Sequence, residues 1–174
     1  MVSSLDGFIA RPDNSVAWMH TPEDAYPEGK SVTHDEIVAF LRTIDCYVMG
    51  SRTYEHALQL GWPYGDTPVI VLTSRQLPSH RPTVEFYTGD LRQLVDERLA
   101  PRFRNIWLVG GALTAQRFLE LGLVDEIKLT LAPVLLGDGL RFFGPISEQP
   151  WRLRSTVAYR NGLVELTYSL TPKS

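Results

Sequence analysis

The stretch Asn105-Ile106-Trp107-Leu108-Val109-Gly110-Gly111-Ala112-Leu113-Thr114 decides the fold of this chain. Its four consecutive apolar residues, 106–109, predict a short strand buried on both faces. Two glycines follow, and residues 112–121 have helical spacing, with Leu113, Phe118 and Leu121 on one side. Glycine lets a ligand approach the backbone, and a helix that begins there directs unpaired N–H groups at the same place. The stretch therefore predicts either a phosphate-binding turn or a tight turn without a ligand.

Length and composition are those of an ordinary globular protein. The 174 residues are 44% hydrophobic and 21% charged, with a formal net charge of −3. We therefore expect one domain over residues 1–174, and neither nucleic acid nor a membrane surface as partner. The one cysteine, Cys46, lies in an apolar run, and the four histidines are dispersed, so we expect no metal site. With neither a membrane-spanning stretch nor a signal peptide before the first element, we expect a cytoplasmic protein.

Apolar strands alternate with helical segments until Gly122. A long loop with three prolines, residues 11–33, precedes a helix whose predicted inner face holds Ile37, Phe40, Leu41 and Ile44. After Gly122 apolar and polar residues alternate, and Asn161-Gly162 predicts a hairpin. The pattern predicts an α/β fold with a mixed, mostly parallel sheet that is flanked by helices and ends in an antiparallel hairpin.

Three of the apolar strands end in residues that suit phosphate or ribose. The strand ends are Gly50-Ser51-Arg52-Thr53, Thr73-Ser74-Arg75 and Gly110-Gly111-Ala112-Leu113-Thr114. Ligands of open α/β sheets bind beyond the carboxyl ends of the strands, so three such ends can enclose one extended ligand. Arginine guanidiniums pair with phosphate through two parallel hydrogen bonds. Together these residues favour a dinucleotide over a ligand-free turn.

These motifs resemble the dihydrofolate reductase-like superfamily. The resemblance rests on Ser-Leu-Asp-Gly-Phe-Ile-Ala (4–10), Met-Gly-Ser-Arg-Thr-Tyr-Glu (49–55), Val-Leu-Thr-Ser-Arg (71–75) and Val-Gly-Gly-Ala (109–112). It covers nearly the whole chain and is strongest to the single-domain branch related to the reductase domain of riboflavin-biosynthesis deaminase-reductases. It implies an NADPH-dependent reductase that transfers a hydride to a small planar conjugated compound, pterin- or pyrimidine-like.

The resemblance also implies roles for individual residues. Cofactor-binding residues would be Ile9 and Ala10 beside the nicotinamide, Gly50, Ser51, Arg52 and Thr53 in a phosphate turn, Thr73, Ser74 and Arg75 near the adenine and its 2′-phosphate, and Gly110, Gly111, Ala112, Leu113 and Thr114 in the pyrophosphate turn. Trp18 would lie in a mobile loop, residues 11–32, that closes over the nicotinamide and contacts the substrate. Asp138 would either hold this lid closed or only occupy a turn.

Asp35 and Asp6 are the candidate catalytic residues. Asp35 lies near the position of the acid that binds the pterin in dihydrofolate reductases, and the alternative is an acid favoured by the helix dipole. Asp6 would contact substrate or only fix its turn by a hydrogen bond.

The chain departs from the motifs of both the dihydrofolate reductases and the riboflavin reductases. Ser51 separates the first glycine from Arg52, and Val109 stands where riboflavin reductases carry a glutamate. We therefore do not expect a true riboflavin-pathway reductase, and the deaminase signature is absent. A non-catalytic nucleotide- or ligand-binding protein on the same fold is the alternative function.

A homodimer is expected on two grounds. Relatives in this branch commonly pair. In addition, the run from Lys128 to Leu136 would form a long apolar strand, which proteins usually cover when it lies at a sheet edge.

Overall fold

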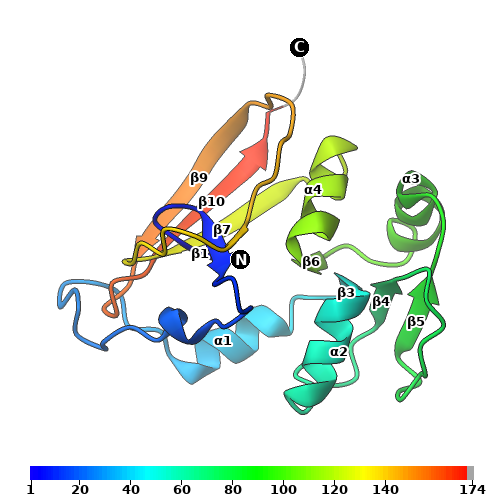
Figure 1. Ribbon diagram of the computed structural model, residues 1–174, viewed down its shortest axis with the longest axis horizontal. Helices are drawn as coiled ribbons and strands as arrows, with labels where there is room; N and C mark the ends of the chain where they lie inside the picture. Colours follow the sequence, from blue (N-terminus) through cyan, green and yellow to red (C-terminus); the bar gives the residue numbers. More distant parts are fainter. Residues whose placement is uncertain (172–174) are drawn as a thin grey trace. The chain divides into compact units, whose positions relative to one another are not determined.

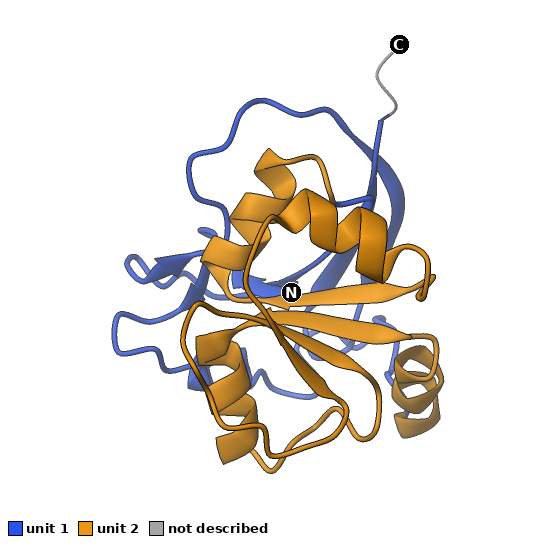
Figure 2. Cartoon of the chain, turned by 90° about the vertical axis from the view of Figure 1, so that its right-hand side faces the viewer, with its two compact units in different colours: residues 1–33, 124–174 blue, residues 34–123 orange. Residues whose placement is uncertain are grey.

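The computed structural model describes residues 1–171 and divides the chain into two compact units (Figure 2). Unit 1 combines residues 1–33 with the described part of 124–174, and unit 2 comprises residues 34–123. Unit 2 is thus an insertion between the two chain segments of unit 1. The single domain over residues 1–174 stays a prediction, and residues 172–174 lie outside the described part.

Unit 2 contains a four-stranded parallel sheet in the order β5-β4-β3-β6 (Figure 1). Its strands are β3 (Cys46–Gly50), β4 (Val69–Leu72), β5 (Val84–Tyr87) and β6 (Ile106–Gly110). The helical segments are α1 (His34–Leu41), α2 (Ser51–Gln59), α3 (Leu91–Gln93), its direct continuation η2 (Leu94–Leu99) and α4 (Ala112–Glu120). Parallel strands need crossovers: α2 connects β3 to β4, α3 with η2 connects β5 to β6, and residues 73–83, which contain no helix, connect β4 to β5.

Two carboxylates lie at the starts of elements in unit 2, one with a local partner and one with partners far along the chain. Asp90 caps the helical segment after β5, because its Oδ1 accepts a hydrogen bond of 2.9 Å from the Gln93 N–H. Asp45 precedes β3, and its Oδ2 accepts hydrogen bonds from the Arg104 and Asn105 N–H groups, each 2.9 Å long. These bonds hold the start of β6 beside the start of β3, which sets the register of the two strands.

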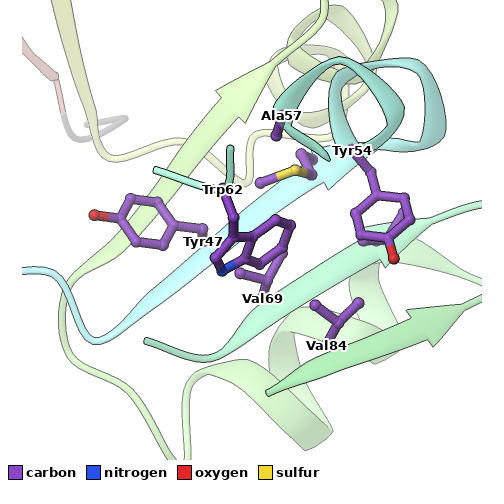
Figure 3. Packing of buried hydrophobic residues seen from close by; sticks show 8 residues of the cluster. Tyr47, Tyr54, Ala57, Trp62, Val69 and Val84 are labelled. Atoms are coloured by element: carbon purple, nitrogen blue, oxygen red, sulfur yellow. The ribbon is translucent and has the colours of Figure 1, made fainter. Parts of the chain in front are cut away.

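Aromatic side chains dominate the core of unit 2 (Figure 3). Tyr54 on α2 and Trp62 after it meet edge to face, with ring centroids 5.9 Å apart. They pack with Tyr47 of β3 and Val69 of β4, which are also buried. This packing holds α2 against the sheet, so the first turn of the helix follows directly from the carboxyl end of β3.

Unit 1 contains a mixed sheet in the order β1-β7-β10-β9. These strands are β1 (Val2–Ser4), β7 (Glu126–Ala132), β9 (Trp151–Ala158) and β10 (Val164–Leu170), and only the β1–β7 pair is parallel. A second small sheet pairs β2 (Phe8–Ala10) with β8 (Leu140–Arg141), and η1 (Ala17–Met19) is a short 3-10 turn. The predicted hairpin at Asn161-Gly162 joins β9 to β10, with Gly162 at φ +78°. The predicted α/β class, with helices beside a parallel sheet and an antiparallel end, is confirmed.

Three predictions of burial are wrong. Residues 106–109 are half-buried, because β6 is the outer strand of the parallel sheet and pairs only with β3. Leu113 of α4 is 66% exposed and Leu121, directly after it, is 38% exposed, whereas Phe118 is buried as predicted. Helix α1 buries no residue: Ile37, Phe40 and Leu41 are exposed, although the Phe40 ring meets Trp107 edge-on with centroids 5.4 Å apart.

One ground for the predicted homodimer is also removed. The run from residue 128 contains most of β7, and β7 pairs with β1 on one side and β10 on the other. It is therefore an interior strand, and it leaves no apolar edge for a second copy to cover.

Candidate functional site

Two helices of unit 2 begin at glycines at the carboxyl ends of neighbouring strands. Gly50 precedes α2 with φ −81° and ψ 164°, and Gly111 precedes α4 with φ −72° and ψ −174°. The N-cap residue of each helix is thus a glycine, which has no side chain to form a capping hydrogen bond. Helix N-termini carry unpaired N–H groups and a partial positive charge, so each start favours an anion.

The two helix starts face one another. Strands β3 and β6 pair in parallel with Met49 opposite Gly110, which brings their carboxyl ends together. A Cβ on Gly50 would lie 2.9 Å from the Thr114 hydroxyl, and one on Gly111 would lie 3.8 Å from the Thr53 hydroxyl. Each glycine thus lies beside a threonine from the other helix. Gly110 has φ +111°, a value that residues with a Cβ rarely adopt, and its peptide bond to Gly111 is cis.

The end of β4 adds an ion pair to this edge of the sheet. The Thr73 hydroxyl accepts a 2.9 Å hydrogen bond from the Arg75 N–H. The Arg75 guanidinium donates a 2.8 Å hydrogen bond to the Glu55 carboxylate of α2. This bond is the main cause of the lowered pKa of Glu55 and the raised pKa of Arg75, and the charge of Arg52 lowers the pKa of Glu55 further.

The predicted residues of unit 2 are therefore gathered at one edge of its sheet, with the exception of Asp35. Ser51, Arg52 and Thr53 form the first turn of α2, and Ala112, Leu113 and Thr114 form the first turn of α4. Ser74 is exposed in the turn after β4. Asp35 lies instead in the first turn of α1, where it is exposed.

In unit 1, the half-buried Asp6 accepts hydrogen bonds from three residues. Its carboxylate accepts hydrogen bonds from the Ser4 hydroxyl at 2.6 Å, the Gly137 N–H at 2.7 Å and the Leu136 N–H at 3.1 Å. The Ser4 bond is the largest cause of a pKa of about 2, lowered from 3.8. Asp6 is thus ionised at neutral pH, and the geometry fits the turn-fixing alternative better than that of a proton donor.

The other predicted residues of unit 1 lie in β2, in the turn at residues 137–139 and in η1. Ile9 and Ala10 are buried in β2. A Cβ on Gly139 would collide with the Ala10 carbonyl oxygen, so glycine is required where this turn meets β2. The Asp138 carboxylate accepts a 2.7 Å bond from the Gly139 N–H, which fits the role of a turn residue. Trp18 is 6% exposed, and its buried indole N–H has no hydrogen-bond partner among residues 1–171.

Comparisons with known proteins assign the chain to a family. A family model described as the RibD C-terminal domain matches residues 1–165. The chain belongs to this family. It is 31% identical over 168 residues to the uncharacterized protein YwjB of Bacillus subtilis (strain 168), covering 95% of this chain and 92% of YwjB.

Solved structures agree with this assignment. A Shewanella sp. PV-4 protein, whose name refers to riboflavin biosynthesis, has a TM-score of 0.84 at 28% identity, covering 99% of this chain and 97% of that one. A Thermotoga maritima protein named as a diaminohydroxyphosphoribosylaminopyrimidine deaminase/5-amino-6-(5-phosphoribosylamino)uracil reductase has a TM-score of 0.69 at 15% identity, covering 98% of this chain and 55% of that one. This RibD C-terminal domain family member thus has a reductase-type fold.

Glu55 is the residue of this site that the sequence did not single out. It ends the motif Met-Gly-Ser-Arg-Thr-Tyr-Glu. Its spacing of three residues from Arg52 on a helix was an available signal, because side chains at i and i+3 are neighbours. Its contact with Arg75, 20 residues away, is visible only in the structure.

The described residues also bear on a metal site, a membrane-spanning helix and a further cavity. Among residues 1–171, no three His, Cys, Asp or Glu side chains come together as a metal site would require. Within the same range, no helix combines the length and apolarity needed to cross a membrane. A cavity of about 200 Å³ in unit 1 is lined by Tyr26, Tyr159 and Leu163 among others, and none of its lining residues was predicted for the site.

Proposed function

We propose that this protein is an NADPH-dependent oxidoreductase that reduces a small planar conjugated compound, pterin- or pyrimidine-like. The observation that carries the proposal is that two helices with glycine N-caps begin side by side, with Thr53 near Gly111 and Thr114 near Gly50. Membership of the RibD C-terminal domain family supports it, since reductase domains of that family use NADPH.

The residues present fit the phosphates of such a cofactor. The N–H groups at the starts of α2 and α4, with the Thr53 and Thr114 hydroxyls, would hold the pyrophosphate. Arg52 and Arg75 would bind the 2′-phosphate, because guanidinium N–H groups match its oxygens. NADPH would supply the hydride. The chain's own task is to bind the cofactor, to orient its nicotinamide toward the substrate and to exclude water.

Proton donation falls to Asp35 in this proposal. Asp6 is ionised at neutral pH and holds residues 136 and 137 by hydrogen bonds, so we assign it a positioning role. Asp35 is exposed in the first turn of α1. If Asp35 donates the proton, Asp35→Asn should lower kcat while leaving NADPH affinity unchanged.

A non-catalytic nucleotide-binding protein is the second candidate. The observation in its favour is that Asp6, one of the two carboxylates predicted for catalysis, is fully engaged in structural bonds. Val109, in place of a glutamate, also removes a substrate contact that the riboflavin reductases have. Both candidates require the same cofactor site, so binding and turnover must be measured separately.

Cofactor binding is the first test. Titration with NADPH, followed by its fluorescence, should give a dissociation constant in the micromolar range. Thr53→Ala and Thr114→Ala should each weaken binding about three- to tenfold, the loss expected for one hydrogen bond. Thr83→Ala is the matched control, since Thr83 precedes β5 at the amino-terminal edge of the sheet. Absence of binding to the unchanged protein would refute both candidates.

Turnover separates the two candidates. NADPH oxidation should be followed at 340 nm with pterins, pyrimidines and quinones as substrates. Oxidation that depends on one of these compounds supports the reductase. Tight NADPH binding without oxidation by any of them favours the binding protein.

We also propose a cytoplasmic homodimer, on the ground that relatives in this branch commonly pair. Light scattering at tens of micromolar protein should give a mass of twice 19.6 kDa. A mass of one chain at that concentration would contradict it.

A further inference from the structure

Glu55 interacts with both arginines that the proposed function assigns to the 2′-phosphate. Its Oε2 accepts a hydrogen bond of 2.8 Å from Nη2 of Arg75, which joins the middle of α2 to the segment after β4. Arg52 precedes it by three residues in the same helix, and the charge of Arg52 acts on the Glu55 carboxylate. The negative charge of this one carboxylate therefore offsets part of the positive charge that the two arginines bring to this edge of the sheet.

A carboxylate and a phosphate bind a guanidinium in the same way. Both accept its N–H hydrogen bonds through paired oxygens, so one Arg75 side chain cannot serve both fully at once. The two arginines contribute two positive charges and Glu55 removes one, which leaves a weaker field for a phosphate that carries close to two negative charges. Glu55 also repels that phosphate directly.

We propose that Glu55 is a specificity-determining residue that competes with the 2′-phosphate for Arg75 and so lowers the preference of this protein for NADPH over NADH. The inference rests on the proposed function, because it needs a nicotinamide dinucleotide at the strand ends. NADH carries a hydroxyl in place of the 2′-phosphate and has no need to displace the ion pair.

The ion pair can open for a ligand. The side chains of Arg75 and Glu55 are 51% and 42% exposed, and ion pairs with that much water contact are weak. The backbone of Arg75 is held separately, by the bond from its N–H to the Thr73 hydroxyl. Arg75 therefore stays at the end of β4 when its guanidinium changes partner.

The test compares the dissociation constants of NADPH and NADH for the unchanged protein and for Glu55→Gln, which keeps the shape of the side chain and removes its charge. Glu55→Gln should raise the preference for NADPH, taken as the NADH constant divided by the NADPH constant, about three- to tenfold. The gain should shrink at 0.5 M salt, because exposed charges are screened. Glu120→Gln is the matched control: Glu120 bonds Gln116 at the far end of α4, and its loss should leave the preference unchanged.

A double substitution tests the competition itself. In an Arg75→Ala background the same Glu55→Gln change should have a clearly smaller effect on the preference, because the shared partner is gone. An equal effect in that background would overturn the competition for Arg75. A preference that is unchanged or lowered by Glu55→Gln, with both cofactors still binding, would overturn the inference and leave the proposed function standing. If neither cofactor binds the unchanged protein, the proposed function fails and the inference with it.

Discussion

At the scale of single residues, Asp6 shows how one carboxylate can join distant parts of a chain. It receives N–H groups from residues 136 and 137, which are 130 and 131 positions away. Its partner Ser4 also accepts a bond of 2.9 Å from the Phe8 N–H, so the turn between β1 and β2 closes on itself. The carboxylate therefore holds the residues before β8 against the residues before β2.

Replacing Asp6 by Asn should lower the melting temperature at pH 7, because a neutral amide accepts these hydrogen bonds more weakly than a carboxylate. The folded-state pKa of about 2 lies below the ordinary 3.8, so the ionised group stabilises the fold above pH 3.8. This stabilisation is lost as the pH falls from 3.8 toward 2, where both states bind the proton. Thermal unfolding should be measured for the unchanged protein and for Asp6→Asn between pH 7 and pH 3. The difference between their melting temperatures should become smaller as the pH falls.

Asp138→Asn is the control for Asp6, since Asp138 makes a bond only to its neighbour Gly139 among the contacts described. It should change the melting temperature less. A melting temperature untouched by Asp6→Asn, together with a large fall in kcat, would return Asp6 to the catalytic role.

Arg75 and Arg52 should also act as single residues, each through its own guanidinium. Charge-assisted hydrogen bonds contribute about 1.5–3 kcal/mol, and 1.4 kcal/mol is tenfold in affinity. Replacing either arginine by Ala should weaken NADPH about tenfold or more and leave NADH nearly unchanged. Arg117→Ala, in the last turn of α4, is the control and should affect neither cofactor. Equal losses for both cofactors would show that the arginines do not bind the 2′-phosphate.

At the scale of elements, the loop before α1 has two parts with different surroundings. Its second part lies along the β9–β10 hairpin: the Tyr26 and Lys30 N–H groups donate to the Arg160 and Ala158 carbonyls at 2.7 and 2.8 Å. Asp24 also pairs with the Arg160 guanidinium at 2.8 Å. Its first part contains η1 and the buried Trp18. A lid over the nicotinamide is therefore expected from residues 11–20 alone.

Hydrogen exchange should separate the two parts of the loop. The amides of Tyr26 and Lys30 should exchange slowly, because both are hydrogen-bonded to the hairpin. NADPH should slow exchange within residues 11–20 and leave residues 26–30 unchanged if the first part is the lid. Protection gained equally by both parts, or by neither, would contradict this division.

Gly29→Ala tests the docking of the second part. A Cβ at this position would collide with the Tyr159 backbone, so the substitution should speed exchange at Tyr26 and Lys30. Ser31→Ala, two residues on and exposed, is the control and should leave exchange there unchanged.

At the scale of the whole molecule, one unit is built from two separate segments of the chain and the other from a single segment. Unit 1 is assembled from both chain ends, because β1 pairs with β7 and the Met1 ammonium donates to the Lys128 carbonyl at 2.8 Å. Unit 2 is one continuous segment between them. Bringing the two segments of unit 1 together therefore costs a large loop-closure entropy. Folding of unit 2 reduces this cost, because it shortens the flexible chain between the two segments.

If residues 1–174 are one domain, heat should unfold the protein in a single cooperative transition. Calorimetry should then give equal calorimetric and van't Hoff enthalpies. Deleting Met1 to Ser4 should remove β1 and lower the melting temperature of this one transition. Two separate transitions, of which the deletion shifts only one, would show that the two units are independent domains.

The sequence alone determined the elements and the family. Apolar runs and turn residues located β6, the ends of β3 and β4 and the hairpin at Asn161-Gly162, because periodicity and turn preference act between residues close in the chain. The motifs at the strand ends also indicated the reductase-type family to which the chain belongs. All of these depend on short-range order.

Only the tertiary structure decided how the side chains meet. The placement of Thr114 beside Gly50, of Arg75 on Glu55 and of Asp6 on residues 136 and 137 depends on strand order and register, which join positions far apart in the chain. The same long-range pairing left β6 half-buried and made β7 an interior strand, against both predictions. Burial and charge pairing are set by neighbours in space, and a single sequence shows only the neighbours along the chain.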